Sequence, residues 1–106
     1  MDRFCDLHTH SLASDGSYAP SALISLAKDA GLSAIALTDH NTLAGLPDFL
    51  ASAPGTTVEA IPGIEFSTDW EEAELHIVAL FLRPEHYIPI NGLLAEARQR
   101  KLESKQ

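Results

Sequence analysis

The 106-residue chain is 45% hydrophobic and 21% charged, which is typical of one globular domain and argues against a disordered, collagen-like or disulfide-scaffold protein. Its apolar runs, such as Ile77 to Leu82, are far shorter than the roughly 20 residues of a membrane span, and its first residues lack the apolar core of a secretory signal. The single Cys5 cannot form an internal disulfide, which is typical of a reducing compartment. We therefore expect a cytoplasmic protein with no membrane partner and with Cys5 buried in a strand.

Charge is distributed unevenly along the chain. The net charge of -8 comes from 15 Asp+Glu and 7 Lys+Arg, and most of the bases lie after residue 82. An acidic body argues against a broad nucleic-acid-binding face, because that affinity depends on Lys and Arg neutralising phosphates. Bound metal cations could still supply positive charge for a phosphate substrate. The acids of residues 71–74 are expected to keep the surface soluble, and the basic cluster of residues 98–101 fits either a solvated helix face or a phosphate contact.

Apolar periodicity predicts alternating strands and helices. In chain order, the expected elements are a strand at 3–7, a helix at 20–30, a strand at 33–38, a short helix at 47–53, a strand at 58–66, a strand at 75–82 and a helix from 90 to about 105. Pro20 suits the first turn of the first helix, and Gly31 suits the position just after its end. This order of elements predicts an α/β fold built on a parallel sheet or barrel.

Side chains that can bind metal lie near the ends of the predicted strands. They are His8, His10 and Asp15 after the first strand, His40 after the second, Glu65 at the end of the third and His76 at the start of the fourth. Because His8 and His10 are two residues apart, an extended backbone points both imidazoles to the same side. Imidazole with carboxylate suits Zn, Mn or Fe, and the absence of cysteine from the set argues against a closed structural zinc site. The pattern therefore predicts an open, catalytic metal site.

Two further carboxylates leave alternatives open. Asp39 precedes His40 and could either bind metal or orient an imidazole as an outer partner of the site, and we favour the second interpretation. Asp6 either caps backbone amides at the end of its strand or supports the site.

The spacing of Glu65 and His76 predicts how their strands are joined. Too few residues separate them for a parallel crossover, which takes about a dozen or more. If both side chains reach one metal, the two strands should form an antiparallel hairpin.

Four ordered motifs resemble those of a known family. They are the segments 6–11 (DLHTHS) with 14–16 (SDG), 37–42 (LTDHNT), 62–68 (PGIEFST) and 74–78 (ELHIV). Together they resemble the first four motifs of the PHP (polymerase and histidinol phosphatase) superfamily, and most closely the branch that contains bacterial nucleotide phosphatases and a 5′–3′ exoribonuclease. The resemblance covers nearly the whole chain.

The resemblance implies both a fold and an activity. Residues 1–106 would form the N-terminal part of a PHP domain, which is a distorted (β/α)7 TIM-like barrel. The implied activity is hydrolysis of phosphate esters of nucleotides or short oligonucleotides by a metal-activated hydroxide, with two or three divalent ions of Mn, Zn or Fe. By the same resemblance the first metal is held by His8 and His10, a second by His76, and a third by Asp15 with His40, with Glu65 bridging the first two. Asp39 is expected to support this catalytic site.

Further motifs of the family are missing after His76. Those motifs supply a ligand from a later loop and an Asp-x-His, whereas this chain stops within a predicted helix. We therefore expect a truncated product or a naturally short gene, with weak metal binding and little or no activity. An incomplete barrel exposes sheet edges, so self-association through these edges is also expected.

Two other functions remain open at this point. A non-catalytic module derived from the PHP fold could bind metal without turnover and dock a partner or dimerise. A metal-dependent amidohydrolase also begins with His-x-His after its first barrel strand, although the Ser-Asp-Gly and Thr-Asp-His segments argue against this reaction.

Overall fold

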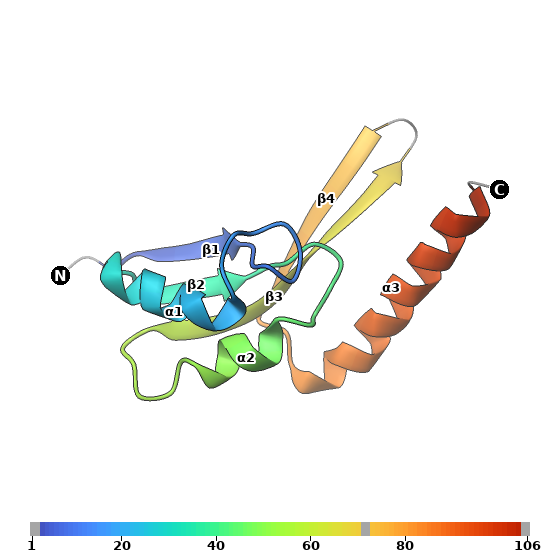
Figure 1. Ribbon diagram of the computed structural model, residues 1–106. Coiled ribbons are helices and arrows are strands. Elements are labelled where there is room, and N and C mark those ends of the chain that lie inside the picture. Colours follow the sequence, from blue (N-terminus) through green and yellow to red (C-terminus); the bar gives the residue numbers. More distant parts are fainter. Residues whose placement is uncertain (1–2, 71–72, 105–106) are drawn as a thin grey trace.

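The computed structural model describes residues 3–70 and 73–104. Within these residues, the elements in chain order are β1 (Cys5–Thr9), α1 (Pro20–Asp29), β2 (Ala34–Leu37), α2 (Leu46–Ala51), β3 (Glu59–Trp70), β4 (Ala73–Leu80) and α3 (Pro84–Ser104). The strands form one sheet in the order β1-β2-β3-β4, in which the first three are parallel and β4 is antiparallel to β3 (Figure 1). The predicted α/β fold and the predicted antiparallel hairpin are therefore confirmed.

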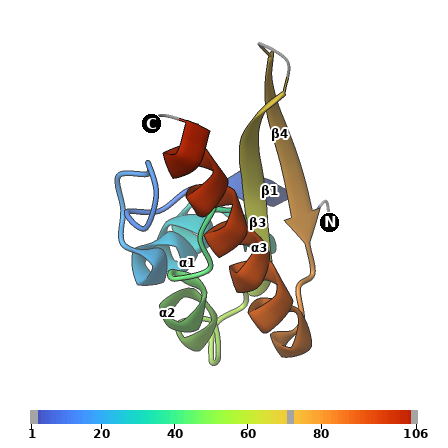
Figure 2. The same cartoon turned by 90° about the vertical axis from the view of Figure 1, so that its right-hand side faces the viewer.

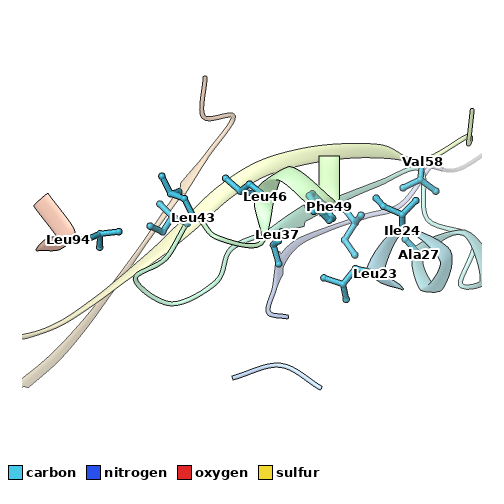
Figure 3. Packing of buried hydrophobic residues seen from close by; sticks show 11 residues of the cluster. Leu23, Ile24, Ala27, Leu37, Leu43, Leu46, Phe49, Val58 and Leu94 are labelled. Atoms are coloured by element: carbon cyan, nitrogen blue, oxygen red, sulfur yellow. The ribbon is translucent and has the colours of Figure 1, made fainter. Parts of the chain in front are cut away.

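The main hydrophobic core lies between the sheet and the helices α1 and α2. Leu23, Ile24 and Ala27 of α1 are buried there, because residues three and four apart share one face of a helix (Figure 3). Phe49 of α2 and Leu37 of β2 are almost completely buried beside them. This packing fixes β2 and β3 at the centre of the sheet, and these strands carry the residues described below.

Helix α1 begins where the sequence predicts and ends one residue before the predicted position. Pro20 is its first residue, where a proline costs no hydrogen bond because the first amides of a helix have no partner within it. Gly31 follows the helix with a φ of 78°, a conformation that residues with a Cβ rarely adopt. These two residues define the length of α1.

The β3–β4 hairpin extends well beyond the parallel part of the sheet (Figure 1). Strand β3 pairs with β2 only as far as Pro62, whereas its pairing with β4 runs from Gly63 to Trp70. Consequently Glu65 and His76 lie inside their strands, and the expectation that they mark strand ends was wrong. The polar residues between them suggested a loop, but backbone hydrogen bonds hold an antiparallel pair together without a run of apolar side chains.

Helix α3 is the last element that the structure describes, and it lies beside the hairpin (Figure 1 and Figure 2). It begins at Pro84 and not at residue 90, and it continues through Pro89. The prediction started after Pro89 because a proline inside a helix removes one backbone hydrogen bond. Leu94 anchors α3 to the main core. Among the residues described, no helix combines the length and the apolarity needed to cross a bilayer.

Strands β1 and β4 form the two edges of the sheet. Strand β1 spans Cys5–Thr9, two residues later than the predicted strand at 3–7, and Cys5 is exposed. The prediction of a buried Cys5 was wrong because β1 has a neighbour on one side only. Self-association through these edges stays a prediction.

Candidate metal centre

The candidate centre lies on the face of the sheet opposite α1 and α2. Side chains alternate between the two faces of a strand, so Ile64 of β3 enters the main core while Glu65 points to the other face. The ends of β1 and β2 lie close together, since His10 follows β1, His40 follows β2 and the two rings are in contact. A backbone bridge between His40 and Glu65 joins the end of the β2 segment to the middle of β3.

Glu65 is the middle of the cluster. It is 3% exposed, and its two carboxylate oxygens lie against four imidazoles. Oε1 accepts a hydrogen bond from His8 Nε2 and lies 3.2 Å from His10 Nε2. Oε2 lies 2.8 Å from His76 Nδ1 and 3.5 Å from His40 Nδ1. One buried carboxylate therefore gathers four ring nitrogens from three separate segments of the chain, around residues 8–10, 40 and 76.

The surroundings of Glu65 favour its ionised form. Burial alone raises the pKa of this carboxyl, because it removes water from the charged form. The hydrogen bond with His8 and the charges of His40, His8 and His10 act in the opposite direction and leave the pKa below its usual value. An ionised carboxylate held in place by imidazoles is a suitable ligand for a cation.

Asp15 forms a second, more exposed side of the cluster. Its side chain is 66% exposed, with Oδ1 3.5 Å from His10 Nδ1 and Oδ2 3.2 Å from His40 Nε2. The rings of His10 and His40 are stacked, with centroids 4.3 Å apart and planes 13° apart. Each of these histidines thus presents one ring nitrogen toward Glu65 and the other toward Asp15.

The hydrogen-bond partners of Asp39 differ from the predicted imidazole. Its carboxylate is 2% exposed and accepts hydrogen bonds from Ser11 N at 2.6 Å, Ser11 Oγ at 2.7 Å and Ser14 Oγ at 2.7 Å. Among the described residues these serines, and not an imidazole, are the hydrogen-bond partners of the carboxylate. Asp39 therefore ties the loop that carries Asp15 to the end of β2.

The same loop depends on a glycine. Gly16 N donates to Ser11 O at 2.8 Å, and a Cβ at Gly16 would lie only 2.1 Å from the carbonyl oxygen of His10. No larger residue fits there without moving the backbone that follows β1. The Ser-Asp-Gly segment thus places Asp15 opposite the two stacked imidazoles.

Ser67 and Glu74 contact the cluster, and sequence reasoning did not single them out. The Ser67 hydroxyl oxygen lies 2.7 Å from His40 Nδ1 and 2.9 Å from His76 Nδ1. Glu74, expected only to solvate the surface, also has Oε1 3.4 Å from His76 Nε2; Glu71 and Glu72 lie outside the described residues. The period of two in a strand is the signal that could have found both, because Ser67 follows Glu65 by two residues and Glu74 precedes His76 by two.

Two other residues stand apart from the cluster. His86 lies near the start of α3, where its Nδ1 accepts a hydrogen bond from Arg83 N at 3.0 Å. Asp6 Oδ1 accepts one from His8 N at 3.2 Å, which is the amide-capping alternative.

The donor set fits divalent metal ions. Three overlapping groups of side chains each bring their ligand atoms within 4.8 Å of one another: His8, His10 and Glu65; His10, Asp15 and His40; and His40, Glu65 and His76. The buried His10 Nδ1 has no hydrogen-bond partner among the described residues, as expected of an atom whose partner is a metal. Nitrogen and oxygen donors without cysteine match Zn, Mn or Fe and not a closed structural zinc site.

Comparison with known proteins identifies the class of protein that the fold and the cluster define. The chain is 42% identical over 80 residues to a 5′–3′ exoribonuclease from Haemophilus influenzae, covering 76% of this chain and 29% of the relative. It is 37% identical over 79 residues to a 3′,5′-nucleoside bisphosphate phosphatase from Chromobacterium violaceum, covering 74% and 28%.

Two solved structures share the fold. An amidohydrolase from Chromobacterium violaceum matches with a TM-score of 0.81 and 33% identity over 93% of this chain and 34% of that chain. A metal-dependent phosphoesterase from Bifidobacterium adolescentis matches with a TM-score of 0.81 and 27% identity over 95% and 35%. The sheet and its helices are thus the N-terminal part of a metal-dependent hydrolase fold.

Residues 6–105 match the PHP domain, and the chain belongs to the PHP family. The chain spans about a third of the length of these relatives and structures.

Proposed function

We propose that the cluster around Glu65 holds divalent metal ions and that the metal-loaded site hydrolyses phosphate esters of nucleotides or short oligonucleotides. The observation that carries this proposal is the position of Glu65, which is buried between the ring nitrogens of His8, His10, His40 and His76. Nitrogen and oxygen donors that come within ligand distance of one another around a buried carboxylate support a bound cation.

The proposed ligands form two groups, one around Glu65 and one around Asp15. His8, His10 and His76 would bind metal around Glu65. The contacts of its two oxygens with different imidazoles support a role for Glu65 as a ligand shared by two ions. The second side is formed by Asp15 and His40, which would hold a further ion. Two or three ions of Mn, Zn or Fe suit these donors.

The relatives suggest the substrate. One is named for cleavage of RNA and the other for a nucleoside 3′,5′-bisphosphate. Both kinds of molecule carry a second phosphate one nucleoside away from the first. We propose the same class of substrate here, and the net charge of -8 then makes bound cations necessary for attracting it.

The chain's own residues set up the reaction. When bound, the metal would lower the pKa of a water molecule and offset charge on the phosphoryl oxygens. Glu65 holds the imidazoles in a fixed arrangement from the middle of the sheet. Asp39, through Ser11 and Ser14, holds the Asp15 loop in place. Ser67 positions the rings of His40 and His76.

The test compares two histidine variants. Manganese binding by calorimetry and phosphate release from a nucleoside bisphosphate are measured for the unaltered chain, His76→Ala and His86→Ala. We expect slow, manganese-dependent phosphate release that His76→Ala abolishes and His86→Ala preserves, since His86 lies outside the cluster.

The other candidate functions give different results in the same experiment. Manganese binding that depends on His76 without hydrolysis of any phosphoester would contradict a hydrolase and support a non-catalytic metal-binding module. Cleavage of an amide but of no phosphoester would support an amidohydrolase.

A further inference from the structure

A groove lies beside the candidate centre, between the β3–β4 hairpin and α3. Its volume is about 1070 Å³, and Asn41, Ser67 and Glu74 line one wall. Ser67 contacts His40 and His76 of the centre, and Glu74 lies 3.4 Å from His76. Phe66 in this groove packs on the core side of β3, whereas Ser67 and Glu74 contact the centre, so the groove meets the centre at the edge of the hairpin. A molecule at the centre could reach the groove around that edge.

The opposite wall carries positive charge. It is formed by the part of α3 that contains Arg98, Arg100 and Lys101, in a chain with only 7 Lys+Arg. Arg100 NH2 lies 2.5 Å from Glu96 Oε1, so these two charges offset each other. Arg98 is exposed, lines the groove and takes part in no ion pair with another described residue. Its guanidinium is thus available to a ligand in the groove.

The inner surface of the groove is apolar. Phe66 of β3 and Leu93, Leu94 and Ala97 of α3 line it. An aromatic side chain is a surface on which a nucleobase can stack. The volume lies just above the range of about 300–1,000 Å³ that is typical of ligand sites, so a nucleotide can be accommodated.

We propose that this groove binds the nucleoside next to the reacting phosphate and that Arg98 binds the second phosphate beyond it. The assignment rests on the proposed function and adds a specificity-determining residue to it. Guanidinium groups bind phosphate through charge-assisted, often bidentate hydrogen bonds. Helix α3 therefore makes the site prefer substrates with two phosphates separated by one nucleoside over nucleoside monophosphates.

Equilibrium dialysis of the manganese-loaded chain tests this preference. The probes are adenosine 3′,5′-bisphosphate, adenosine 5′-monophosphate and a 5′-phosphorylated RNA dinucleotide, with phosphate release followed in parallel. We expect the bisphosphate to bind about tenfold more tightly than the monophosphate, which is the effect of about one charge-assisted hydrogen bond. Arg98→Glu should remove this advantage and leave the affinity for the monophosphate within about twofold.

Arg83→Glu is the matched control. It makes the same change of charge at the start of α3, and Arg83 pairs with Glu85 outside the groove. Far-UV circular dichroism checks that α3 is intact in both variants. Because the dinucleotide carries an internal phosphodiester, a loss of affinity for it in Arg98→Glu extends the assignment to RNA, and a loss confined to the bisphosphate restricts it to terminal phosphates.

Three outcomes would overturn the assignment. They are a preference that survives Arg98→Glu, a preference lost equally in Arg83→Glu, and no preference in the unaltered chain. Failure of the proposed function has a separate signature, namely monophosphate binding that responds neither to manganese nor to His76→Ala.

Discussion

The two sides of the centre are supported in different ways. Glu65 lies in β3 at the middle of the sheet, is 3% exposed and faces four imidazoles. Asp15 lies in a loop, has a side chain that is 66% exposed and faces two. Regular elements position side chains more tightly than loops do. The Glu65 side is therefore fixed by the fold itself, whereas the Asp15 side depends on the hydrogen bonds that Asp39 makes to its loop.

The largest effect is expected from Glu65→Gln, which removes the charge on the fixed side and keeps the size of the side chain. Loss of an outer-shell partner of a metal site costs about 10–100-fold in affinity, and loss of a shared ligand should cost more than about 100-fold. Manganese titration by calorimetry should show that each ion either no longer binds or binds more weakly. Unchanged binding in this variant would show that Glu65 is not a shared ligand.

Asp15→Asn should have a smaller and one-sided effect. It removes a ligand from the exposed side only, so the number of bound ions should fall by one while binding at His8, His10 and Glu65 continues. Metal analysis after dialysis measures this number. Loss of all ions would contradict the separation of the two sides.

Asp39→Asn should weaken the same side indirectly. The side-chain amide of asparagine accepts hydrogen bonds only at its oxygen, whereas both oxygens of Asp39 accept them. Some of the hydrogen bonds from Ser11 and Ser14 are therefore lost in the variant. We expect the ion near Asp15 to bind about 10–100-fold more weakly. The visible spectrum of the cobalt-loaded chain should change with it.

Asp48→Asn is the control for this experiment. Asp48 is an exposed carboxylate in the first turn of α2, and its removal should change neither the spectrum nor the affinity. A cobalt spectrum of Asp39→Asn identical to that of the unaltered chain would contradict the positioning role of Asp39.

The smallest effect is expected on the stability of the metal-free protein at low pH. The pKa of Glu65 is lowered in the folded chain, so its carboxylate stabilises the fold above its unfolded pKa of about 4.3. This stabilisation is lost as the pH falls through the lower folded pKa. Urea unfolding between about pH 5 and pH 3 should therefore show a steeper loss of stability in the unaltered chain than in Glu65→Gln. An equal loss in both chains would mean that Glu65 does not contribute to acid unfolding.

Local sequence patterns predicted much of the fold because the relevant forces are local. Pro20 and Gly31 set the ends of α1, and the short spacing between Glu65 and His76 required a hairpin. The extent of the hairpin could not be predicted, since it depends on backbone pairing between strands. The exposure of Cys5 depends on which strand lies at the edge of the sheet, and a single strand's sequence does not determine that order.

The candidate site shows the same difference between what local sequence patterns predict and what the path of the folded chain decides. The six residues predicted as metal ligands converge in the structure, because residue type and position near the predicted strand ends pointed to them. Their roles as ligands stay a prediction. The partners of Asp39 could not be inferred, because Ser11 and Ser14 are brought to it by the path of a loop. A carboxylate next to a histidine in sequence need not contact that histidine in space.

Anomalous diffraction at the manganese absorption edge, from a crystal of the chain grown with manganese, tests the central claim most directly. We predict at least one peak within coordination distance of both a Glu65 oxygen and a ring nitrogen of His8, His10 or His76. Peaks only elsewhere, or no peak beside Glu65 at saturating manganese, would contradict a metal centre built around this residue.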